Sequence, residues 1–439
     1  MQTLVIIPSL MHKYSFSAPL AWLFSDHVAQ VRGIYSIDLN KAMVKAYDSF
    51  IVELGWFIEL VEFDLIVRFI RKHNKKATIL FGGLYAQLKY REIFANSPVD
   101  YFIKGDNEVP IKHYLDGVDP RAIPNMVGRD FENERRYVFQ QEDYKSLEFN
   151  LDWFPDYFKY LAGAALPDDE MDLRFDEMPL FPRYLEKPGE NLAPERRWRV
   201  PPRGGYHYLP MLLTARGECP IAHAGCEYCL GSRKELLCSI YGRRTLIMDN
   251  ETLIYHLHKI EKKFSRASIV IGNKFDYDFR GHFFDLEVTI EADYFNRPED
   301  IAKILPAFRQ AKVHTTLYED TLTCKKVRDA AEIAAFQALE DENHQVYFLA
   351  FGNDAEASAI PKQRQLHAEV ILPHWTNYDF YDDRANALRK SREWYFLTGQ
   401  TNLYPLPRRI STRLIRSIAF RVAYLLNKAK LIDLSKKVL

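Results

Sequence analysis

The first 140 residues alternate short apolar runs with longer amphipathic segments. The clearest amphipathic segment is 58–73, where apolar residues recur at helical spacing along one face. The apolar runs predict buried strands at 3–8, 33–37, 49–54, 77–81 and 99–103. Short buried strands that alternate with helices are typical of a parallel sheet with right-handed crossovers. The pattern therefore predicts an α/β, doubly wound domain over residues 1–140.

Two glycine turns directly follow strands of this predicted sheet. Gly82 and Gly83 follow the run ATILF, and Gly105 follows the run DYFIK. Ligands of parallel sheets bind at the carboxyl ends of the strands, and glycine lets the backbone approach a ligand or turn tightly into a helix. Both interpretations, ligand contact and a simple turn, remain open from the sequence.

The periodicity breaks after residue 140 and a second alternation begins near residue 209. Residues 141–208 are rich in Pro, Trp, Tyr and charge, which predicts a linker that packs over the junction between two domains. Beyond it, the predicted helices are 251–264, 297–311 and a long one through Asp341. Six predicted strands, at 210–214, 267–273, 286–292, 313–319, 345–353 and 368–374, indicate a partial (βα)6 barrel over 209–400.

Length and charge narrow the class of protein. A chain of 439 residues predicts two domains plus appendages. Acidic and basic residues balance at 59 each, so no global field attracts nucleic acid, and we expect no nucleic-acid partner. No apolar run approaches the roughly 18 residues of a membrane span, and the N-terminus lacks the basic start of a signal peptide. We therefore expect a soluble, cytoplasmic protein.

Three of the five cysteines lie within eleven residues: Cys219, Cys226 and Cys229. So few and so clustered thiols do not suit a disulfide scaffold, and in a reducing compartment they indicate a metal site. Three thiolates can hold three irons of a [4Fe-4S] cubane and leave the fourth iron without a protein ligand. The alternative is a structural zinc site, which needs a fourth ligand such as Cys238 or His223. The barrel-like pattern downstream favours the iron–sulfur cluster.

The cysteine segment, ARGECP followed by CEYCLGS, resembles the radical-SAM superfamily, and in particular its cobalamin-linked members. Over residues 1–140, ATILFGG followed by DYFIKGDNE is similar to the N-terminal cobalamin-binding domain of those enzymes. Two departures stand out. Six residues separate Cys219 from Cys226, where three is usual, and no Asp-x-His-x-x-Gly motif is present, His12 being the histidine of the first loop. The resemblance implies a Rossmann-like, cobalamin-binding-type domain followed by a radical-SAM barrel.

The resemblance also implies cofactors, roles and an activity. It implies radical chemistry on an unactivated carbon with an external one-electron donor, most commonly cobalamin-dependent methyl transfer; cyclisation or rearrangement without methylation is the alternative. No residue identifies the substrate as a small molecule, lipid or peptide. The carboxyl ends of the predicted barrel strands further nominate Thr316, Glu319, Asn353 and His374. The implied SAM-binding residues are Tyr228, Gly272, Asn273, Glu291 and Gly352, and the implied cobalamin-binding residues are Gly82, Gly83 and Gly105.

The C-terminal segment 401–439 is locally basic, with apolar residues at helical spacing and Arg and Lys between them. This pattern predicts a basic amphipathic helix that docks on its own domain. The alternative is peripheral contact of residues 408–439 with an anionic membrane surface.

Overall fold

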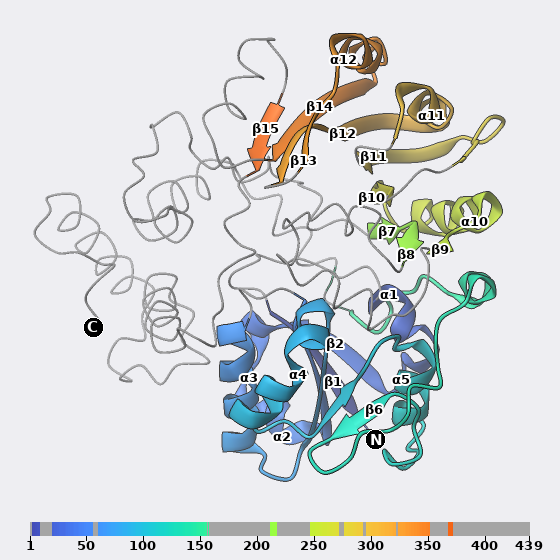
Figure 1. The fold of residues 1–439 in the computed structure, drawn as a ribbon. Helices are drawn as coiled ribbons and strands as arrows, with labels where there is room; N and C mark the ends of the chain where they lie inside the picture. The colour runs from blue at the N-terminus through green and yellow to red at the C-terminus, as the bar shows by residue number, and fades with distance from the viewer. Residues whose placement is uncertain are drawn as a thin grey trace, which may run out of the picture.

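The computed structural model describes ten stretches of the chain, which form two large sheets with flanking helices and one two-stranded sheet (Figure 1). No helix in these stretches is long and apolar enough to cross a membrane. The described residues are 2–8, 20–55, 60–155, 157, 211–216, 246–271, 276–292, 296–321, 324–351 and 368–371.

The first sheet is parallel and doubly wound, as the sequence predicts. Its strands lie in the order β2-β1-β3-β4-β5-β6; the first five are parallel and β6 is antiparallel to β5. The order 2-1-3-4-5 is one of the common doubly wound arrangements, with its switch point between β1 and β3. The strands are β1 (Thr3–Ile7), β2 (Val31–Tyr35), β3 (Ser49–Glu53), β4 (Thr78–Gly82), β5 (Tyr101–Ile103) and β6 (Met126–Gly128).

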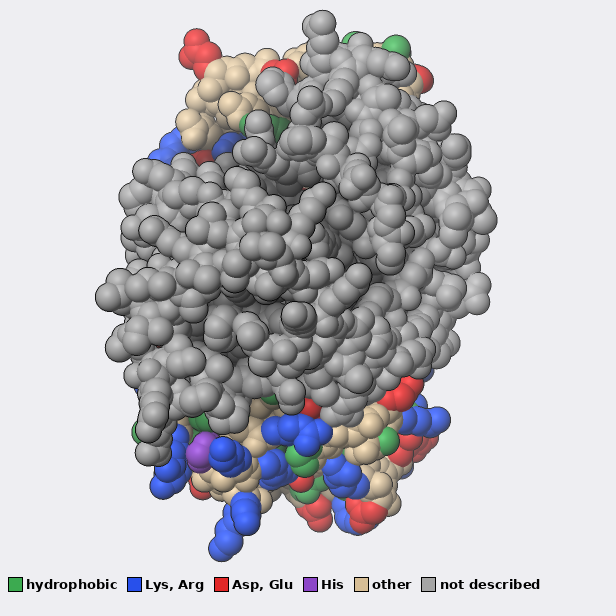
Figure 2. Space-filling view, turned by 90° about the vertical axis from the view of Figure 1, so that its left-hand side faces the viewer, with side chains coloured by type: hydrophobic (Ala, Val, Ile, Leu, Met, Phe, Trp, Pro, Cys, Tyr) green, Lys and Arg blue, Asp and Glu red, His purple; other side chains and the backbone are tan. Residues whose placement is uncertain are grey.

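Both faces of this sheet are buried, because alternate residues of each strand pack against different helices. Leu4 and Ile6 of β1 pack into one apolar cluster, whereas Val5 and Ile7 pack into another. The first cluster includes residues of α2 (Lys41–Ala46), α3 (Leu60–His73) and α4 (Leu84–Asn96), and the second includes α1 (Leu20–Leu23) and α5 (Glu108–Leu115). In Figure 2, Lys and Arg side chains with Asp and Glu between them cover the described part of this domain that faces the viewer.

The second sheet has six parallel strands in chain order, β7-β10-β11-β12-β14-β15. Each overlaps a strand that the sequence predicts. Three helices, α10 (Asn250–Glu261), α11 (Pro298–Ala302) and α12 (Ala330–Gln337), lie along one side of the sheet (Figure 1). The strands are β7 (Met211–Leu213), β10 (Arg266–Ile271), β11 (Phe284–Ala292), β12 (Phe308–Thr321), β14 (His344–Phe351) and β15 (Ala368–Ile371).

Two predicted helices of the second half are wrong in extent. The helix predicted over 297–311 ends at Ala302, and a 3-10 turn over Leu305–Ala307 leads into β12. Pro306 has no N–H to continue a helix, and from Ala311 to Val313 burial alternates with the period of a strand. The long helix predicted through Asp341 is only α12, because β13 (Cys324–Val327) precedes it as an antiparallel partner of β12.

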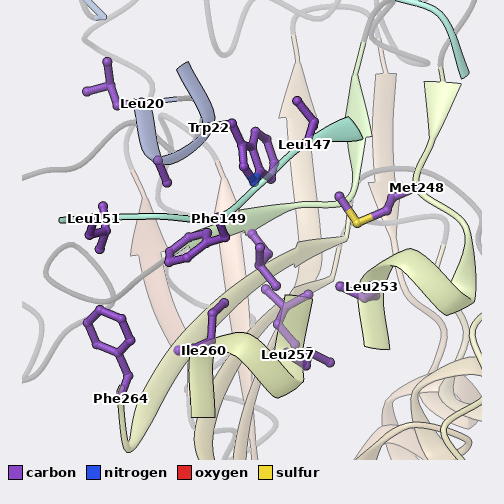
Figure 3. Packing of buried hydrophobic residues seen from close by; sticks show 14 of the residues in the cluster. Leu20, Trp22, Leu147, Phe149, Leu151, Met248, Leu253, Leu257, Ile260 and Phe264 are labelled. Atoms are coloured by element: carbon purple, nitrogen blue, oxygen red, sulfur yellow. The ribbon is translucent and has the colours of Figure 1, made fainter. Parts of the chain in front are cut away.

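Residues 139–157 lie between the two sheets and contact both. The Gly33 N–H of β2 donates to the Trp153 carbonyl at 2.7 Å, and Glu148 accepts a hydrogen bond of 2.8 Å from Tyr255 of α10. Side chains from α1, from this segment and from α10 form one continuous apolar cluster (Figure 3). Burial in a shared core therefore holds the two sheets together. The labelled residues of the cluster are Leu20, Trp22, Leu147, Phe149, Leu151, Met248, Leu253, Leu257, Ile260 and Phe264.

The conformation of the turn after β4 requires glycine at its second position. Gly83 has a φ of +110°, and a Cβ added there would overlap the Leu54 carbonyl. We expect Gly83→Ala to lower the free energy of unfolding by about 2 kcal/mol, measured by urea denaturation. Gly82→Ala is the matched control, because its Cβ would meet no atom of the described residues within 4 Å. Equal losses in the two variants would contradict this account of the turn.

Candidate functional site

The structure brings Gly82, Gly83 and Gly105 to one edge of the first sheet, at the carboxyl ends of β4 and β5. Gln87 of α4 joins the two turns: its side-chain oxygen accepts from the Gly105 N–H at 2.8 Å, and its amide donates to the Ile103 carbonyl at 3.0 Å. Gln87 is buried, and the sequence pattern did not identify it. We call this edge, with its three glycines and Gln87, the glycine edge.

Gly82 leaves open space at the glycine edge. It pairs in register with Glu53 of β3, one of the two strands at the switch point of the sheet. Among the described residues, no atom lies within 4 Å of the position that a Gly82 Cβ would take. Backbone without a side chain at the carboxyl end of a strand suits a flat ligand that lies against it. His12 lies outside the described residues.

The turn that follows Gly105 carries two buried carboxylates, and the second half of the chain supplies their cation. Arg216 donates to Glu108 through Nη1, and the same nitrogen lies 3.8 Å from Asp106 Oδ1. Its guanidinium also lies 4.1 Å from the centroid of the Phe139 ring. Burial opposes its charge, but the charges of Glu108 and Asp106 raise the pKa of Arg216, so it stays a cation.

Arg216 also belongs to a short strand pair that closes the cysteine segment. β8 (Ala215–Arg216) pairs antiparallel with β9 (Leu246–Ile247), and we call this pair the stem. Gln141 donates to the Ile247 carbonyl at 2.7 Å, and the Met248 N–H donates to the Thr214 carbonyl at 2.7 Å. Residues 217–245 begin and end at the stem and lie outside the described residues. They contain Cys219, Tyr228, Cys226 and Cys229, with His223 and Cys238.

Strand β11 presents polar side chains on the side of the second sheet opposite the helix-packing side. On β11, Leu286, Val288 and Ile290 are buried apolar residues, and the residues between them, Glu287, Thr289 and Glu291, point the other way. Register places Glu291 beside His314 of β12, and His314 beside Tyr347 of β14. Neighbouring strands lie about 4.8 Å apart, so Glu291, His314 and Tyr347 form a row, which we call the polar row.

Burial shifts the pKa values of Glu291 and His314 in the polar row. Burial raises the pKa of Glu291 to about 7, and burial together with the charge of Lys312 lowers the pKa of His314 to about 4. The His314 and Tyr347 rings meet edge to face with centroids 5.4 Å apart. At neutral pH the row therefore presents a carboxyl group that readily gains or loses a proton beside a neutral imidazole. This combination suits hydrogen bonding to a polar ligand and proton exchange with it.

Of the predicted SAM-binding residues, only Glu291 belongs to the described residues. Thr316 and Glu319 lie in β12. The sequence did not single out His314 or Arg216. Neither residue stands out in the sequence. His314 lies in a strand, two positions after Lys312, and Arg216 is a single arginine that precedes the cysteines. The remaining candidates lie outside the described residues: Gly272, Asn273, Gly352, Asn353, His374 and the C-terminal segment 401–439.

Glu291 makes stability depend on pH in a predictable direction. Its pKa rises from 4.5 to about 7 on folding, so between these pH values the unfolded state loses a proton that the folded state keeps. The resulting loss of stability is small at pH 5 and reaches its full size above pH 7. We expect Glu291→Gln to raise the free energy of unfolding by about 2 kcal/mol at pH 8, and by much less at pH 5. Urea denaturation at both pH values measures this.

Glu287→Gln is the control on the same strand and the same side of the sheet. Glu287 pairs with Arg266 at 2.9 Å and with Lys312 at 3.8 Å, so this substitution removes ion pairs and should slightly destabilise at both pH values. A Glu291→Gln variant that is no more stable at pH 8 than the wild type would contradict the burial of an ionisable carboxyl group there.

No protein-family profile matches the chain, and no curated protein matches its sequence. Solved structures of two enzymes are among those that resemble its fold. The radical S-adenosylmethionine methyltransferase TsrM from Kitasatospora setae, with tryptophan substrate and a SAM analogue bound, aligns with a TM-score of 0.51 and 12% identity over 85% of this chain and 73% of its own. The cobalamin-dependent S-adenosylmethionine radical enzyme OxsB, with aqua-cobalamin bound, aligns with a TM-score of 0.50 and 10% identity over 89% of this chain and 56% of its own. The resemblance that the sequence predicts to cobalamin-linked radical-SAM enzymes is therefore confirmed at the level of the fold.

Proposed function

We propose that this chain is a radical-SAM iron–sulfur enzyme that modifies an unactivated carbon. The reaction that we propose is cobalamin-dependent methyl transfer, the commonest outcome that the resemblance implies. Its cluster is held by Cys219, Cys226 and Cys229. The proposal also assigns residues 1–140 to a cobalamin-binding-type domain, 141–208 to a linker, 209–400 to a partial (βα)6 barrel and 401–439 to a basic C-terminal helix.

The observation that carries the proposal is the position of the stem. It follows the first strand of the second sheet, it holds both ends of the cysteine segment, and Arg216 bonds it to the turn beside the glycine edge. A cysteine-held cofactor and a ligand at the glycine edge would therefore lie close to each other. Two cofactors that act on one substrate need that closeness.

The donor set of the cysteine segment fits a cluster with one open iron. Three thiolates on one segment could bind three irons and would leave the fourth iron open for SAM. When bound, the cluster would supply one-electron reduction of SAM, and cobalamin would supply the capacity for methyl transfer. The chain's own part is to provide the cysteines as thiolates, to exclude water and to orient the two ligands.

The glycine edge fits a corrin-type ligand. Gly82 presents backbone with open space beside it, at the strand next to the switch point, and the Gln87 bridge holds the Gly105 turn in place. Gly82, Gly83 and Gly105 would hold the ligand by backbone contact, without an axial histidine from an Asp-x-His-x-x-Gly motif.

The polar row suits the inner side of a partial (βα)6 barrel. In parallel barrels the carboxyl ends of the strands carry the chemistry, and Glu291 lies in the last two residues of β11. Glu291 would accept hydrogen bonds from the SAM ribose, with Tyr228, Gly272, Asn273 and Gly352 as further contacts. An external one-electron donor is required, and the substrate class stays open.

The cluster proposal predicts which cysteines matter. After anaerobic reconstitution with iron and sulfide, we expect a brown protein with about four irons per chain, and loss of colour and iron in Cys226→Ala. Cys238→Ala is the matched control and should keep both, since Cys238 is not among the proposed ligands. Metal analysis and the visible spectrum measure this. A colourless protein with one zinc that Cys238→Ala abolishes would establish the structural zinc site instead.

The cobalamin proposal predicts the effect of filling the open space at the glycine edge. The wild type reconstituted with hydroxocobalamin should retain about one cobalt per chain after gel filtration. Gly82→Leu should retain at least tenfold less at the same free concentration while it keeps its iron, because its side chain enters the ligand's space. Wild type that retains iron but no cobalt would instead favour radical cyclisation or rearrangement without methylation.

A further inference from the structure

We propose that Arg216 is a positioning residue that couples ligand binding at the glycine edge to the geometry of the cysteine segment. This inference rests on the proposed function, and it adds a route between the two cofactor sites. The route consists of the turn at residues 105–108, the Arg216 guanidinium and the stem.

On the side of the first sheet, the turn is tied to the glycine edge by hydrogen bonds. Gly105 bonds to Gln87, as described above, and the Asp106 carbonyl accepts from Asn125 Nδ2 at 3.3 Å. The Asp106 carboxylate accepts from the Phe139 N–H at 3.0 Å. A ligand that contacts Gly105 must therefore also set the positions of Asp106 and Glu108, because these residues follow on one tightly bonded turn.

On the side of the second sheet, Arg216 lies three residues before Cys219. Its strand partner is Leu246, the first described residue after the cysteine segment, and Tyr144 donates to the Leu246 carbonyl at 3.4 Å. Any shift of the Arg216 backbone therefore moves both ends of the cysteine segment together.

A simple ion pair between domains is the plainer interpretation, and two observations argue for more. The shared apolar core already holds the sheets together, and burying a charged triad is on balance no more stabilising than apolar residues of the same volume. The orientation of the Arg216 guanidinium is fixed, because the planar group lies over Phe139 while it bonds to Glu108. Lysine would keep the charge and lose that orientation.

The first experiment uses the reconstituted full-length chain and compares Arg216→Lys with Arg328→Lys. Arg328 is the matched control, a buried arginine of the second domain that donates to the Asn296 carbonyl and Thr315 at 3.1 Å and lies over the Phe336 ring. The readouts are the electron paramagnetic resonance spectrum of the reduced cluster and hydrogen–deuterium exchange of peptides covering 217–245, each with and without hydroxocobalamin.

We expect hydroxocobalamin to shift the cluster spectrum and to slow exchange of the cysteine segment by about tenfold in the wild type and in Arg328→Lys. In Arg216→Lys, iron and cobalt contents should match the wild type, and both responses should be lost. An Arg216→Lys variant that responds like the wild type would overturn the coupling. Wild type that retains iron but no cobalt would also refute it and would leave the cluster proposal standing.

The second experiment needs no cofactor and separates the two proposals. In the chain without added metal, Glu108→Gln removes the partner of Arg216 from the first-sheet side, and Glu332→Gln removes the partner that lies 3.7 Å from Arg328. We expect Glu108→Gln to speed exchange at residues 211–216 and 246–248 by about tenfold, with no change in Glu332→Gln. Unchanged exchange in Glu108→Gln would refute the positioning role whether or not a cluster forms.

Discussion

Two carboxylates buried at the edge of a sheet cannot remain there without a cation. Asp106 and Glu108 are 6% and 8% exposed, and leaving them unpaired would cost several kcal/mol. The cation is Arg216, which comes from the other half of the chain, immediately before the cysteines. This one requirement determines which edge of the first sheet faces the stem.

The apolar core holds the two sheets together, and the charged contact at Arg216 fixes how they are oriented. One cluster runs from β1 through α1 and residues 139–157 to α10 and the second sheet, and burial of such area is the main stabilising term. Apolar burial is not directional, however, so it does not by itself fix one relative arrangement of the two sheets. Even the polar group inside it is kept uncharged: burial lowers the pKa of His256 of α10 to about 4. Directional contacts include the hydrogen bonds and charges at Arg216, Glu148 and Gln141.

The two sides of the second sheet carry different kinds of side chain. Alternate residues of β11 pack against the helices as Leu286, Val288 and Ile290 do, which leaves Thr289 and Glu291 on the other side. That side carries a carboxyl group whose pKa is raised to about 7 and an imidazole whose pKa is lowered to about 4. A folded protein accepts the destabilisation that such groups cause where they bind or react, which is why perturbed pKa values mark functional sites.

Local pattern was enough to determine much of this protein. Short apolar runs and the amphipathic stretches between them predict both parallel sheets. The glycines that follow the strands ATILF and DYFIK are predicted at one edge, because strand ends of a parallel sheet share an edge. Pattern failed where local signals were short or mixed: the three-residue β6, the β12–β13 hairpin, and the helix that Pro306 ends. Only the tertiary structure decided that Gln87 joins the two glycine turns, that His314 lies beside Glu291, and that Arg216 neutralises Asp106 and Glu108. These contacts join residues far apart in the sequence, Arg216 and Glu108 being 108 positions apart, and no local periodicity encodes a partner at that distance.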